Sequence, residues 1–396
     1  MHPRLAIDRL RALAAQFPAV LVLGPRQVGK TTLARMAFAD LPYCDLEDPA
    51  TRALFAEDAR FQLEARAQPA LILDEAQCVP AVFAALRGAI DAERRRRGRF
   101  IILGSAEPTL VRQVAETLAG RVGVVELDPL TAKEAASGTR PQDWRNLWLS
   151  GGFPDALHAY EQGGSFRDWW EAYLRAYTER DLPMLGVTAE PLLMRRLLTM
   201  LAHSQGGLAN YNQLAASLEV SHGTVVRYLD ILERSFLLRR VAPYYRNIGK
   251  RLVKAPKLYL RDTGLLHHLL NIDSLAALDN HPGRGASWET FVIEDIARRE
   301  RCTHPHSQIF FWRTAAGAEV DLLLERGTRR YALEVKTARG ASPYLARSLR
   351  AVLADLKAES ATVIDQAAGA EPLAPGVFRR GFAESLDWLP GGKLQS

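Results

Sequence analysis

Short apolar runs alternate with longer mixed stretches along the first 130 residues. Residues 19–23 read Ala-Val-Leu-Val-Leu without a polar interruption, which is typical of a strand buried within a parallel sheet. Comparable runs occupy residues 43–45, 70–75, 100–105 and 123–127, and helical stretches separate them. The alternation of these five strands with helices predicts an α/β fold built on a parallel sheet.

A glycine-containing segment follows the first of these runs and leads directly into a helical stretch. It has the spacing G-x4-G-K-T, which between a strand and a helix is the signature of a phosphate-binding loop. The two glycines let the backbone wrap so that its N–H groups face the phosphates, Lys30 would reach the β- and γ-phosphates, and Thr31 would offer its hydroxyl to Mg²⁺. The predicted ATP-binding residues are Gly24, Pro25, Arg26, Gln27, Val28, Gly29, Lys30, Thr31 and Thr32.

Two acidic residues end the apolar run of residues 70–75. In a P-loop protein this is a Walker B arrangement, in which Asp74 would hold the Mg²⁺ shell and Glu75 would orient and activate the attacking water. The next run ends in Ser105, which is expected either at a sensor position facing the γ-phosphate or the water, or in an ordinary loop. Walker B on the third strand and a sensor on the fourth is the order of an AAA+ core, which we assign to residues 1–130.

Arg121 lies just before the last of the five runs, in the sequence Leu-Ala-Gly-Arg. In AAA+ rings an arginine at this place often points into the ATP of the neighbouring subunit, and such a finger is worth about 10³–10⁵ in turnover where it has been measured. We therefore expect Arg121 either to serve as a catalytic finger or other nucleotide sensor, which would imply a homo-oligomer such as a ring, or to form a structural salt bridge.

The chain becomes helical and rich in tryptophan after Pro129. Residues 168–185 have the pattern of an amphipathic helix, and we interpret residues 131–205 as a helical lid and linker. Lids of this kind often supply a second arginine sensor, but the sequence singles out no residue for that role. Trp169, Trp170 and Tyr173 are interpreted as core residues.

Residues 206–262 resemble a winged helix-turn-helix. A short helix over 212–218 precedes a second helix that runs from the N-cap Ser221 to Arg234, with a wing expected at residues 235–245. The second helix would present His222, Val226, Arg227 and Asp230 outward, as a recognition helix does in a major groove. Winged helices also bind proteins, so a protein-interaction module is the alternative.

The positive charge of the chain is concentrated in the same segment. Residues 206–262 contain ten Lys or Arg and four acids, a net +6, which equals the net charge of the whole chain. A basic surface of this kind suits a polyanion, so DNA is the expected partner. Charges named for this role are Arg227, Arg239 and Arg240, and the alternative is a basic face with no such partner.

The last part of the chain, residues 280–396, predicts a helix, three strands, a helix and a strand. This order resembles the restriction-endonuclease-like core, and Asp321 with Glu334-Val335-Lys336 matches its D…E-x-K signature. Glu334 and Lys336 are two apart on a strand and project from one face, so Asp321 and Glu334 would hold a second Mg²⁺ while Lys336 orients water or a phosphate. Glu289 would be an outer ligand. A fold kept for DNA binding or dimer contact without cleavage is the alternative.

Several motifs recur together in one protein group. They are Gly-Pro-Arg-Gln-Val-Gly-Lys-Thr-Thr at 24–32, Leu-Asp-Glu-Ala-Gln at 73–77, Leu-Ala-Gly-Arg at 118–121, Gly-Gly-Phe-Pro at 151–154, Arg-Asp-Leu-Pro at 180–183 and Lys-x-Tyr-x2-Asp-Thr-Gly at 257–264. In these the chain resembles prokaryotic AAA-type ATPases with an uncharacterised, restriction-endonuclease-like C-terminal domain. The resemblance covers nearly the whole chain and implies ATP binding and this order of domains.

Composition excludes some classes of protein. No stretch approaches the roughly 20 apolar residues of a membrane helix, and the N-terminus lacks the apolar core of a signal peptide. The three cysteines are far apart and lack metal-ligand spacing, so they are expected to be reduced thiols in a cytoplasmic protein.

The sequence as a whole predicts an ATPase that uses ATP and Mg²⁺ and couples nucleotide turnover to DNA binding or remodelling. Two alternatives stay open at this point. One is a nucleotide-switched regulatory or defence protein that binds a protein partner, and the other is an ATP-gated, Mg²⁺-dependent DNA nuclease.

Overall fold

The N-terminal domain is a parallel sheet with helices on both faces. The computed structural model describes residues 2–105, 108–138, 143–184, 191–245, 254–314, 319–338, 340 and 343–391. The first sheet has the order β2-β3-β4-β1-β5, and every pairing in it is parallel. Its strands are β1 (Ala19–Gly24), β2 (Tyr43–Asp45), β3 (Leu71–Asp74), β4 (Phe100–Ser105) and β5 (Val122–Glu126). The predicted alternation of strands and helices is confirmed.

Separate apolar clusters lie on the two faces of this sheet. One contains Leu10 and Leu13 of α1 with Leu33 of α2, and the other contains Phe55 of α3 and Leu86 of α4. Both faces are therefore covered, which explains why these strands are apolar throughout. The helices are α1 (Ala6–Gln16), α2 (Lys30–Ala37), α3 (Pro49–Arg66), η1 (Ala76–Cys78), α4 (Ala81–Ala92) and α5 (Pro108–Thr117).

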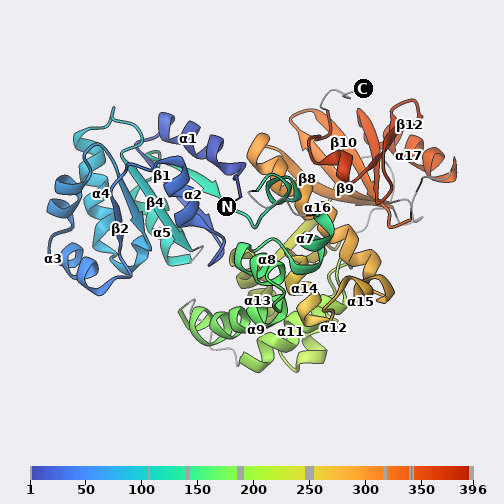
Figure 1. Cartoon of the computed structure of the whole chain (residues 1–396), viewed down its shortest axis with the longest axis horizontal. Coiled ribbons are helices and arrows are strands. Elements are labelled where there is room, and N and C mark those ends of the chain that lie inside the picture. The colour runs from blue at the N-terminus through green and yellow to red at the C-terminus, as the bar shows by residue number, and fades with distance from the viewer. Residues whose placement is uncertain are drawn as a thin grey trace.

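A group of helices joins this domain to the rest of the molecule (Figure 1). The turn η2 is π-helical and continues α9 directly, and the N-cap of α13 is Ser221 as predicted, since its Oγ accepts from Thr224 N at 3.1 Å. The helices are α6 (Ala132–Ala136), α7 (Trp144–Ser150), α8 (Pro154–Glu161), α9 (Phe166–Ala176), η2 (Tyr177–Asp181), α10 (Leu182–Met184), α11 (Pro191–His203), α12 (Tyr211–Leu218), α13 (His222–Arg234), α14 (Thr263–Leu269), α15 (Leu275–Asn280) and α16 (Arg284–Thr303).

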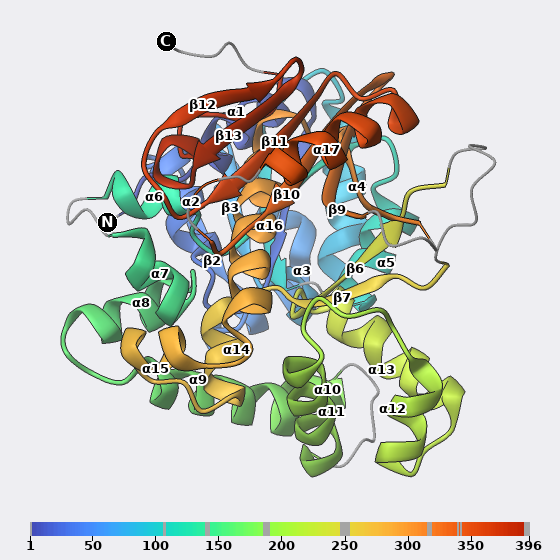
Figure 2. The ribbon, with the colours of Figure 1, turned by 90° about the vertical axis from the view of Figure 1, so that its right-hand side faces the viewer.

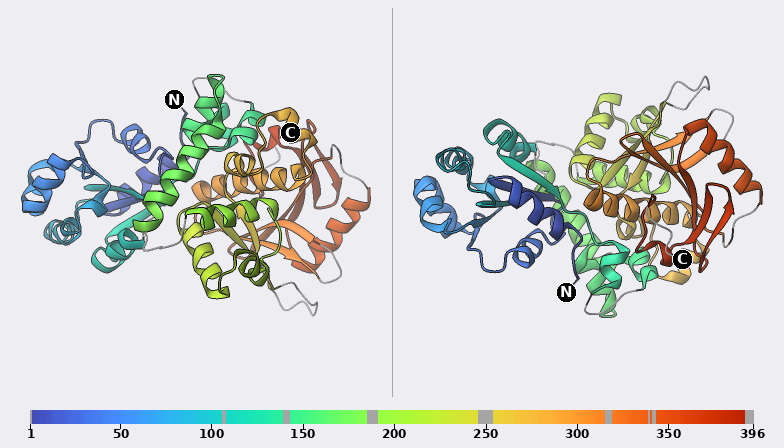
Figure 3. Two further views of the ribbon diagram at one scale, coloured as in Figure 1. Left: turned by 90° about the horizontal axis from the view of Figure 1, so that it is seen from below. Right: turned by 90° about the horizontal axis from the view of Figure 1, so that it is seen from above.

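A mixed sheet, here called the C-terminal sheet, forms the other end of the molecule (Figures 1 and 3). Its order is β12-β13-β11-β10-β9-β8-β6-β7, and α16 packs against it (Figure 2). The elements are β6 (Leu238–Pro243), β7 (Lys257–Leu260), β8 (Gln308–Arg313), β9 (Glu319–Arg326), β10 (Arg329–Val335), α17 (Pro343–Leu356), β11 (Ser360–Asp365), β12 (Ala370–Ala374), β13 (Val377–Gly381) and η3 (Ala383–Ser385). The strands predicted at 309–313, 319–325, 331–336 and 362–364 are thus confirmed within a few residues.

The last residues of the expected wing, 243–245, differ from the prediction. Pro243 pairs with Phe311 of β8, and Tyr244 is buried with its OH 3.1 Å from Glu325 Oε1. Pro243 is therefore the last residue of β6 within the C-terminal sheet, and the N–H of Tyr244 donates to the Phe311 carbonyl oxygen at 2.7 Å, where a turn was expected. The connection between β6 and β7 spans residues 244–256, of which residues 246–253 lie outside the described part of the chain.

Candidate nucleotide-binding site

The phosphate-binding loop lies at the carboxyl end of β1, where the chain turns into α2. Gly29 precedes the helix with φ +96°, a left-handed conformation that disfavours any side chain. A Cβ at Gly24 would lie 2.5 Å from the carbonyl oxygen of Leu127, so only glycine fits there. The two glycines thus have the steric roles that the motif requires.

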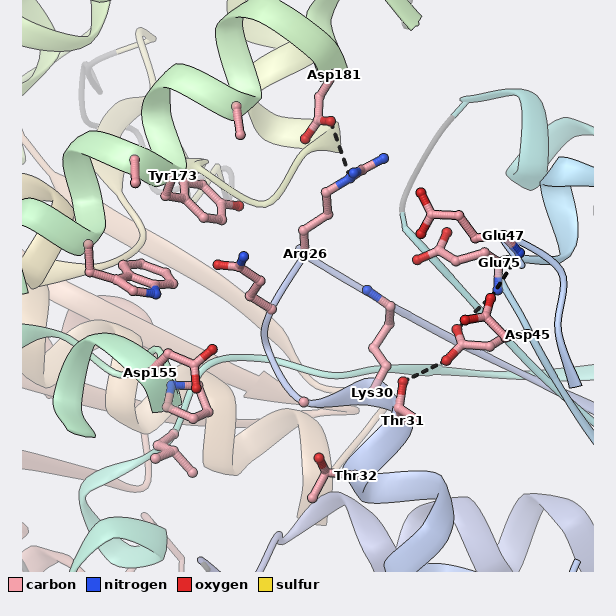
Figure 4. A pocket seen from close by; sticks show the side chains of 18 of the residues that line it. Arg26, Lys30, Thr31, Thr32, Asp45, Glu47, Glu75, Asp155, Tyr173 and Asp181 are labelled. Carbon is pink, nitrogen blue, oxygen red and sulfur yellow. Dashed lines mark hydrogen bonds and ion pairs between the residues drawn. The ribbon is translucent and has the colours of Figure 1, made fainter. Parts of the chain in front are cut away.

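Lys30 and Thr31 begin α2, and both side chains line the cavity beside the loop (Figure 4). The buried Lys30 Nζ donates to the carbonyl oxygens of Gly24 at 3.2 Å and Pro25 at 2.9 Å, and burial lowers the pKa of Lys30. Thr31 Oγ1 donates to Asp74 Oδ2 at 2.6 Å. The two residues expected to hold Mg²⁺ are therefore already in contact, and their oxygen atoms are ligands that this ion prefers. The site fits a Mg²⁺–nucleotide complex.

Glu75 follows Asp74 in an unusual backbone conformation. Its φ of 48° is left-handed, which is uncommon for a residue with a side chain and is typical of functional sites. Burial raises the pKa of Glu75, although the nearby Lys30 favours its charged form, and Gln77 Nε2 donates to its Oε2 at 2.5 Å. A partly buried carboxylate with a raised pKa at this position has the properties of a general base.

The cavity in front of the loop has a second wall from the helical segment, which we define as residues 144–184. Its volume is 740 Å³, and Lys30, Thr31, Asp74 and Glu75 line one side. Side chains from α8, α9 and η2 line the other side, among them Asp155, Trp169, Tyr173, Arg180 and Asp181. Trp170 is fully buried in the core as predicted, whereas Trp169 and Tyr173 also line the cavity, which the sequence analysis did not predict.

Two charged contacts cross this cavity from η2. Arg26 Nε of the phosphate-binding loop lies 3.2 Å from Asp181 Oδ1, and Arg180 Nη2 donates to Glu47 Oε1 at 2.5 Å. Neither of these η2 residues was predicted as a site residue from the sequence. The only signal was the recurring Arg-Asp-Leu-Pro motif, whose spatial partners lie more than 130 residues earlier in the chain.

The other predicted loop residues have varied positions. Gln27 and Thr32 line the cavity, and Val28 is fully buried beneath the loop. Ser105 is paired with Gly24 on the neighbouring strand and is buried, and its Oγ has no hydrogen-bond partner among the described residues. Ser105 therefore stands beside the loop without lining the cavity, and its sensor role stays a prediction.

Arg121 precedes β5 and lies beside the first residue of β1. It is therefore at the amino-terminal end of these parallel strands, whereas the phosphate-binding loop is at their carboxyl-terminal end. Its guanidinium pairs with Asp91 of α4, at 2.8 Å from Nε to Oδ1 and 2.9 Å from Nη2 to Oδ2. Within one chain this is a structural salt bridge. A role of Arg121 as an arginine finger, contacting ATP bound to a second copy of the chain, stays a prediction.

The residues of the D…E-x-K signature meet in the C-terminal sheet beside Glu289 of α16. Lys336 Nζ lies 2.5 Å from Glu334 Oε1, and Asp321 Oδ2 accepts from the backbone N–H of Val335 at 2.9 Å. Burial and the nearby Asp321 carboxylate raise the pKa of Glu334 to about 7. Within the described ranges, no group of three or more His, Cys, Asp or Glu side chains is placed to hold a metal ion.

A residue that the sequence analysis did not assign to this cluster occupies its middle. The buried Lys257 Nζ lies 2.8 Å from Glu319 Oε1, 3.1 Å from Glu289 Oε1 and 3.5 Å from Asp321 Oδ1. Burial opposes its charge, but these three carboxylates raise the pKa of Lys257. Lys257 belongs to the Lys-x-Tyr-x2-Asp-Thr-Gly motif, which was a possible signal.

Four of the ten basic side chains in residues 206–262, namely Arg239, Arg240, Lys257 and Arg261, form ion pairs within the chain, which corrects the expectation that Arg239 and Arg240 contribute free charge to a basic surface. Arg239 is paired with Glu294 of α16 at 2.9 Å, Arg240 with Asp230 at 2.5 Å, and Arg261 with Asp128 at 2.5 Å. A count of charges along the chain cannot show such pairing, because Glu294 and Asp128 lie outside the segment. Exposed basic side chains in the described part of this segment are Arg227, Arg234 and Lys254.

The fold and the site together define an AAA-type P-loop ATPase. A family model described as an AAA domain matches residues 16–136, and models of two domains of unknown function, DUF8612 and DUF4143, match residues 141–276 and 284–377. The uncharacterized proteins Rv2008c of Mycobacterium tuberculosis and Mb2031c of Mycobacterium bovis are each 42% identical over 355 residues, covering 89% of this chain and 77% of theirs. The chain belongs to the same family as these two proteins.

Similar solved structures include the Walker-type ATPase PABY2304 of Pyrococcus abyssi, with 16% identity over 68% of this chain and 96% of that chain and a TM-score of 0.45. A RuvB variant of Thermotoga maritima shares 22% identity over 59% of this chain and 87% of that chain, with a TM-score of 0.31. The family assignment therefore depends on the sequence comparisons. Among the helices in the described part of the chain, none has the length and apolar character needed to cross a bilayer.

Proposed function

We propose that the chain binds ATP with Mg²⁺ at the phosphate-binding loop, hydrolyses it, and uses the nucleotide state to move the helical segment relative to the N-terminal domain. The observation that carries this proposal is the cavity shared between the loop and the α9–η2 side chains. A ligand in that cavity contacts both parts at once, so its binding and release change how they are held together.

The residues of the loop have separate tasks in this proposal. Lys30 exchanges its contacts with Gly24 and Pro25 for phosphate oxygens, because its ammonium is within reach of the loop interior. Mg²⁺, held by Thr31 and Asp74, would supply positive charge to the phosphate oxygens. Glu75 orients the attacking water and accepts its proton, a role that suits a carboxylate whose pKa is raised by burial.

We propose DNA as the partner of the C-terminal half, bound through α13. The pair α12–α13 is a helix-turn-helix, with Glu219 in a left-handed conformation between the helices. His222, Arg227 and Arg234 are exposed on α13. This arrangement supports the resemblance to a winged helix, and strands β8–β11 with Asp321, Glu334 and Lys336 support the resemblance to an endonuclease-like core.

An ATPase assay with the full-length chain tests this function. Turnover is expected without DNA and is expected to rise when single-stranded, duplex or branched DNA is added. Lys30→Ala should abolish nucleotide binding, and Glu75→Gln should bind ATP without turning it over. Lys133→Ala and Glu57→Gln serve as matched controls, because both side chains lie outside the cavity.

Separate outcomes address separate parts of the proposal. Wild-type turnover in Lys30→Ala or Glu75→Gln would refute the ATP site. Turnover that is lost in those variants but unaffected by every form of DNA would retain the ATPase and refute DNA as the partner. The protein would then be a nucleotide switch for another class of partner, such as a protein.

A further inference from the structure

Lys257 is a buried cation held by three carboxylates from two different elements. It lies on β7, and its Nζ reaches Glu289 of α16 at 3.1 Å and Glu319 of β9 at 2.8 Å. Asp321, also on β9, lies at 3.5 Å, and the ring of Phe311 is 5.6 Å away on another side. An ammonium has three N–H donors and no acceptor, so these three carboxylates can satisfy it completely.

The oxygen atoms of this acidic cluster, defined as Glu289, Glu319, Asp321 and Glu334, are mostly committed to protein donors. Glu289 Oε1 also accepts from the Tyr259 OH at 2.6 Å, and Asp321 Oδ2 accepts from Val335 N–H at 2.9 Å. Glu334 Oε2 differs from these atoms, because it is buried and has no hydrogen-bond partner among the described residues. A divalent ion in the middle of the cluster would have to displace the ammonium, because the same oxygens serve both.

We propose that Lys257 takes the place of a divalent cation in the C-terminal sheet, so that the native chain binds no metal ion at Asp321 and Glu334. The D…E-x-K signature supplies carboxylates suited to Mg²⁺, but in this chain Lys257 lies against Asp321 and Lys336 lies against Glu334. Removing the Lys257 ammonium leaves Glu289, Glu319 and Asp321 without their shared cation while Lys336 stays paired with Glu334, and the cluster then becomes a divalent-cation site. This inference concerns the C-terminal sheet and does not depend on ATP hydrolysis.

The position of Lys257 also gives the internal cation a mechanical role. Four residues further along, Arg261 Nη2 lies 2.5 Å from Asp128 Oδ1 at the exit of the N-terminal domain. Next to it, Asp262 Oδ2 accepts from the N–H of Gly152 at 2.9 Å, and Asp262 caps α14. The motif from Lys257 to Gly264 thus connects the acidic cluster to the N-terminal domain and the helical segment. A fixed ammonium keeps this connection in place without any soluble ion.

Titration with Mn²⁺ on the nucleotide-free, full-length chain tests the proposal, with free Mn²⁺ measured by electron paramagnetic resonance. Wild type and Asp321→Asn are expected to take up the same amount of Mn²⁺. Lys257→Met removes the charge and keeps a similar length, and it is expected to bind about one additional Mn²⁺ per chain, as the open set of carboxylates predicts. Adding Asp321→Asn to Lys257→Met should remove the additional ion, and Lys257→Arg should bind as wild type does.

Two results would overturn the proposal. The first is Mn²⁺ uptake by the wild type that Asp321→Asn abolishes, which shows a native metal site. The second is a Lys257→Met protein that is folded by circular dichroism and takes up no additional Mn²⁺. If Lys257→Met does not fold, the comparison of wild type with Asp321→Asn still decides whether the native chain holds a metal there.

Discussion

Arg26 and Asp181 face each other across the candidate ATP site, with Arg26 Nε 3.2 Å from Asp181 Oδ1. Arg26 belongs to the phosphate-binding loop, and Asp181 ends the π-helical turn that follows α9. Turns of this type within helices are frequent at functional sites. Phosphates arriving at the loop compete with Asp181 for Arg26, so the contact makes nucleotide binding and the position of the helical segment depend on each other.

Removing the charge of Asp181 is expected to strengthen ATP binding. Asp181→Asn frees Arg26 and removes a negative charge that faces the phosphate site, so the Kd for ATP should fall by roughly three- to tenfold. Binding of a fluorescent ATP analogue measures this directly. Asp155→Asn is the matched control, because Asp155 lines the same cavity and should leave the Kd near its wild-type value. Weaker or unchanged binding in Asp181→Asn contradicts this competition.

Arg180 is expected to act on turnover more than on binding. It lines the cavity beside Glu75 and is held there by Glu47, so it can transfer from Glu47 to the γ-phosphate when ATP is bound. Loss of a donor aimed at developing charge lowers kcat on the order of 10²-fold. Arg180→Ala should therefore show a large loss of kcat with a small change in the Kd for ATP. Arg175→Ala, one turn earlier and paired with Glu179, should turn over as wild type does.

The local elements were predictable because their signals lie within a few residues. The strands at 43–45 and 100–105 have the predicted bounds, and the run Phe-Ile-Ile-Leu at 100–103 shows why, since a short apolar run bounded by turn signals is typical of a buried strand. The cap at Ser221 follows from a hydroxyl directly before a helix. The phosphate-binding loop is likewise local, and its glycines are explained by contacts with near neighbours.

Partners that are distant in sequence could not be predicted in the same way. Arg239 carries a positive charge in a basic segment, yet its partner Glu294 is 55 residues later on α16. Tyr244 follows a proline and resembles part of a turn, but β8 lies alongside it only after the chain has formed α14 to α16. Charge and turn patterns describe a segment alone, and strand pairing or ion pairing across the fold overrides them.

Arg239 is expected to affect stability and not DNA recognition. Its guanidinium forms two hydrogen bonds to the buried Glu294, and removing one partner of such a pair leaves an uncompensated charge in the interior. Breaking a buried pair typically costs about 3–5 kcal/mol of unfolding free energy. The loss in Arg239→Ala is expected near the lower end of this range, because Arg261 and Arg298 remain close to Glu294 and partly compensate its charge. Urea unfolding of Arg239→Ala measures the loss. Arg60→Ala, which breaks an exposed pair with Glu64, should change the unfolding free energy by less than about 1 kcal/mol.

Arg227 is the side chain through which DNA binding can be tested without disturbing the fold. It is exposed on α13, so Arg227→Ala should weaken binding to all DNA sequences and reduce the magnitude of the log–log salt slope by about one, as expected for a phosphate contact. Fluorescence anisotropy with labelled DNA at several salt concentrations gives both quantities. Arg60→Ala on α3 is the control and should leave the slope unchanged. An unchanged slope in Arg227→Ala excludes a phosphate contact from this residue.

His267 is expected to make the C-terminal half sensitive to acid. The imidazole is completely buried, with Nδ1 2.8 Å from the Leu149 carbonyl oxygen and Nε2 2.6 Å from Ser287 Oγ. The carbonyl can only accept, so Nδ1 carries the proton and Nε2 accepts from Ser287. The hydroxyl of Ser287 in turn accepts from Trp148 Nε1–H at 2.9 Å. When His267 is neutral, every donor in this series of hydrogen bonds is matched to an acceptor. A second ring proton, on Nε2, would instead face the hydroxyl hydrogen of Ser287.

The direction of the pH effect follows from this arrangement. Burial lowers the pKa of His267 from 6.5 to about 4, so the unfolded chain binds a proton before the folded chain does. The neutral ring therefore contributes its full stabilisation above pH 6.5. This contribution decreases as the pH falls from 6.5 through 4, and the total loss is at most about 3 kcal/mol. Urea midpoints followed by tryptophan fluorescence between pH 8 and pH 4 measure this loss, since Trp148 belongs to the same series of hydrogen bonds.

His267→Asn should be less stable than wild type at pH 8 but should lose less stability below pH 6.5, so the plots of stability against pH for the two proteins converge. His203→Asn, exposed on α11, should retain the wild-type pH dependence, and parallel curves for wild type and His267→Asn would contradict the assignment.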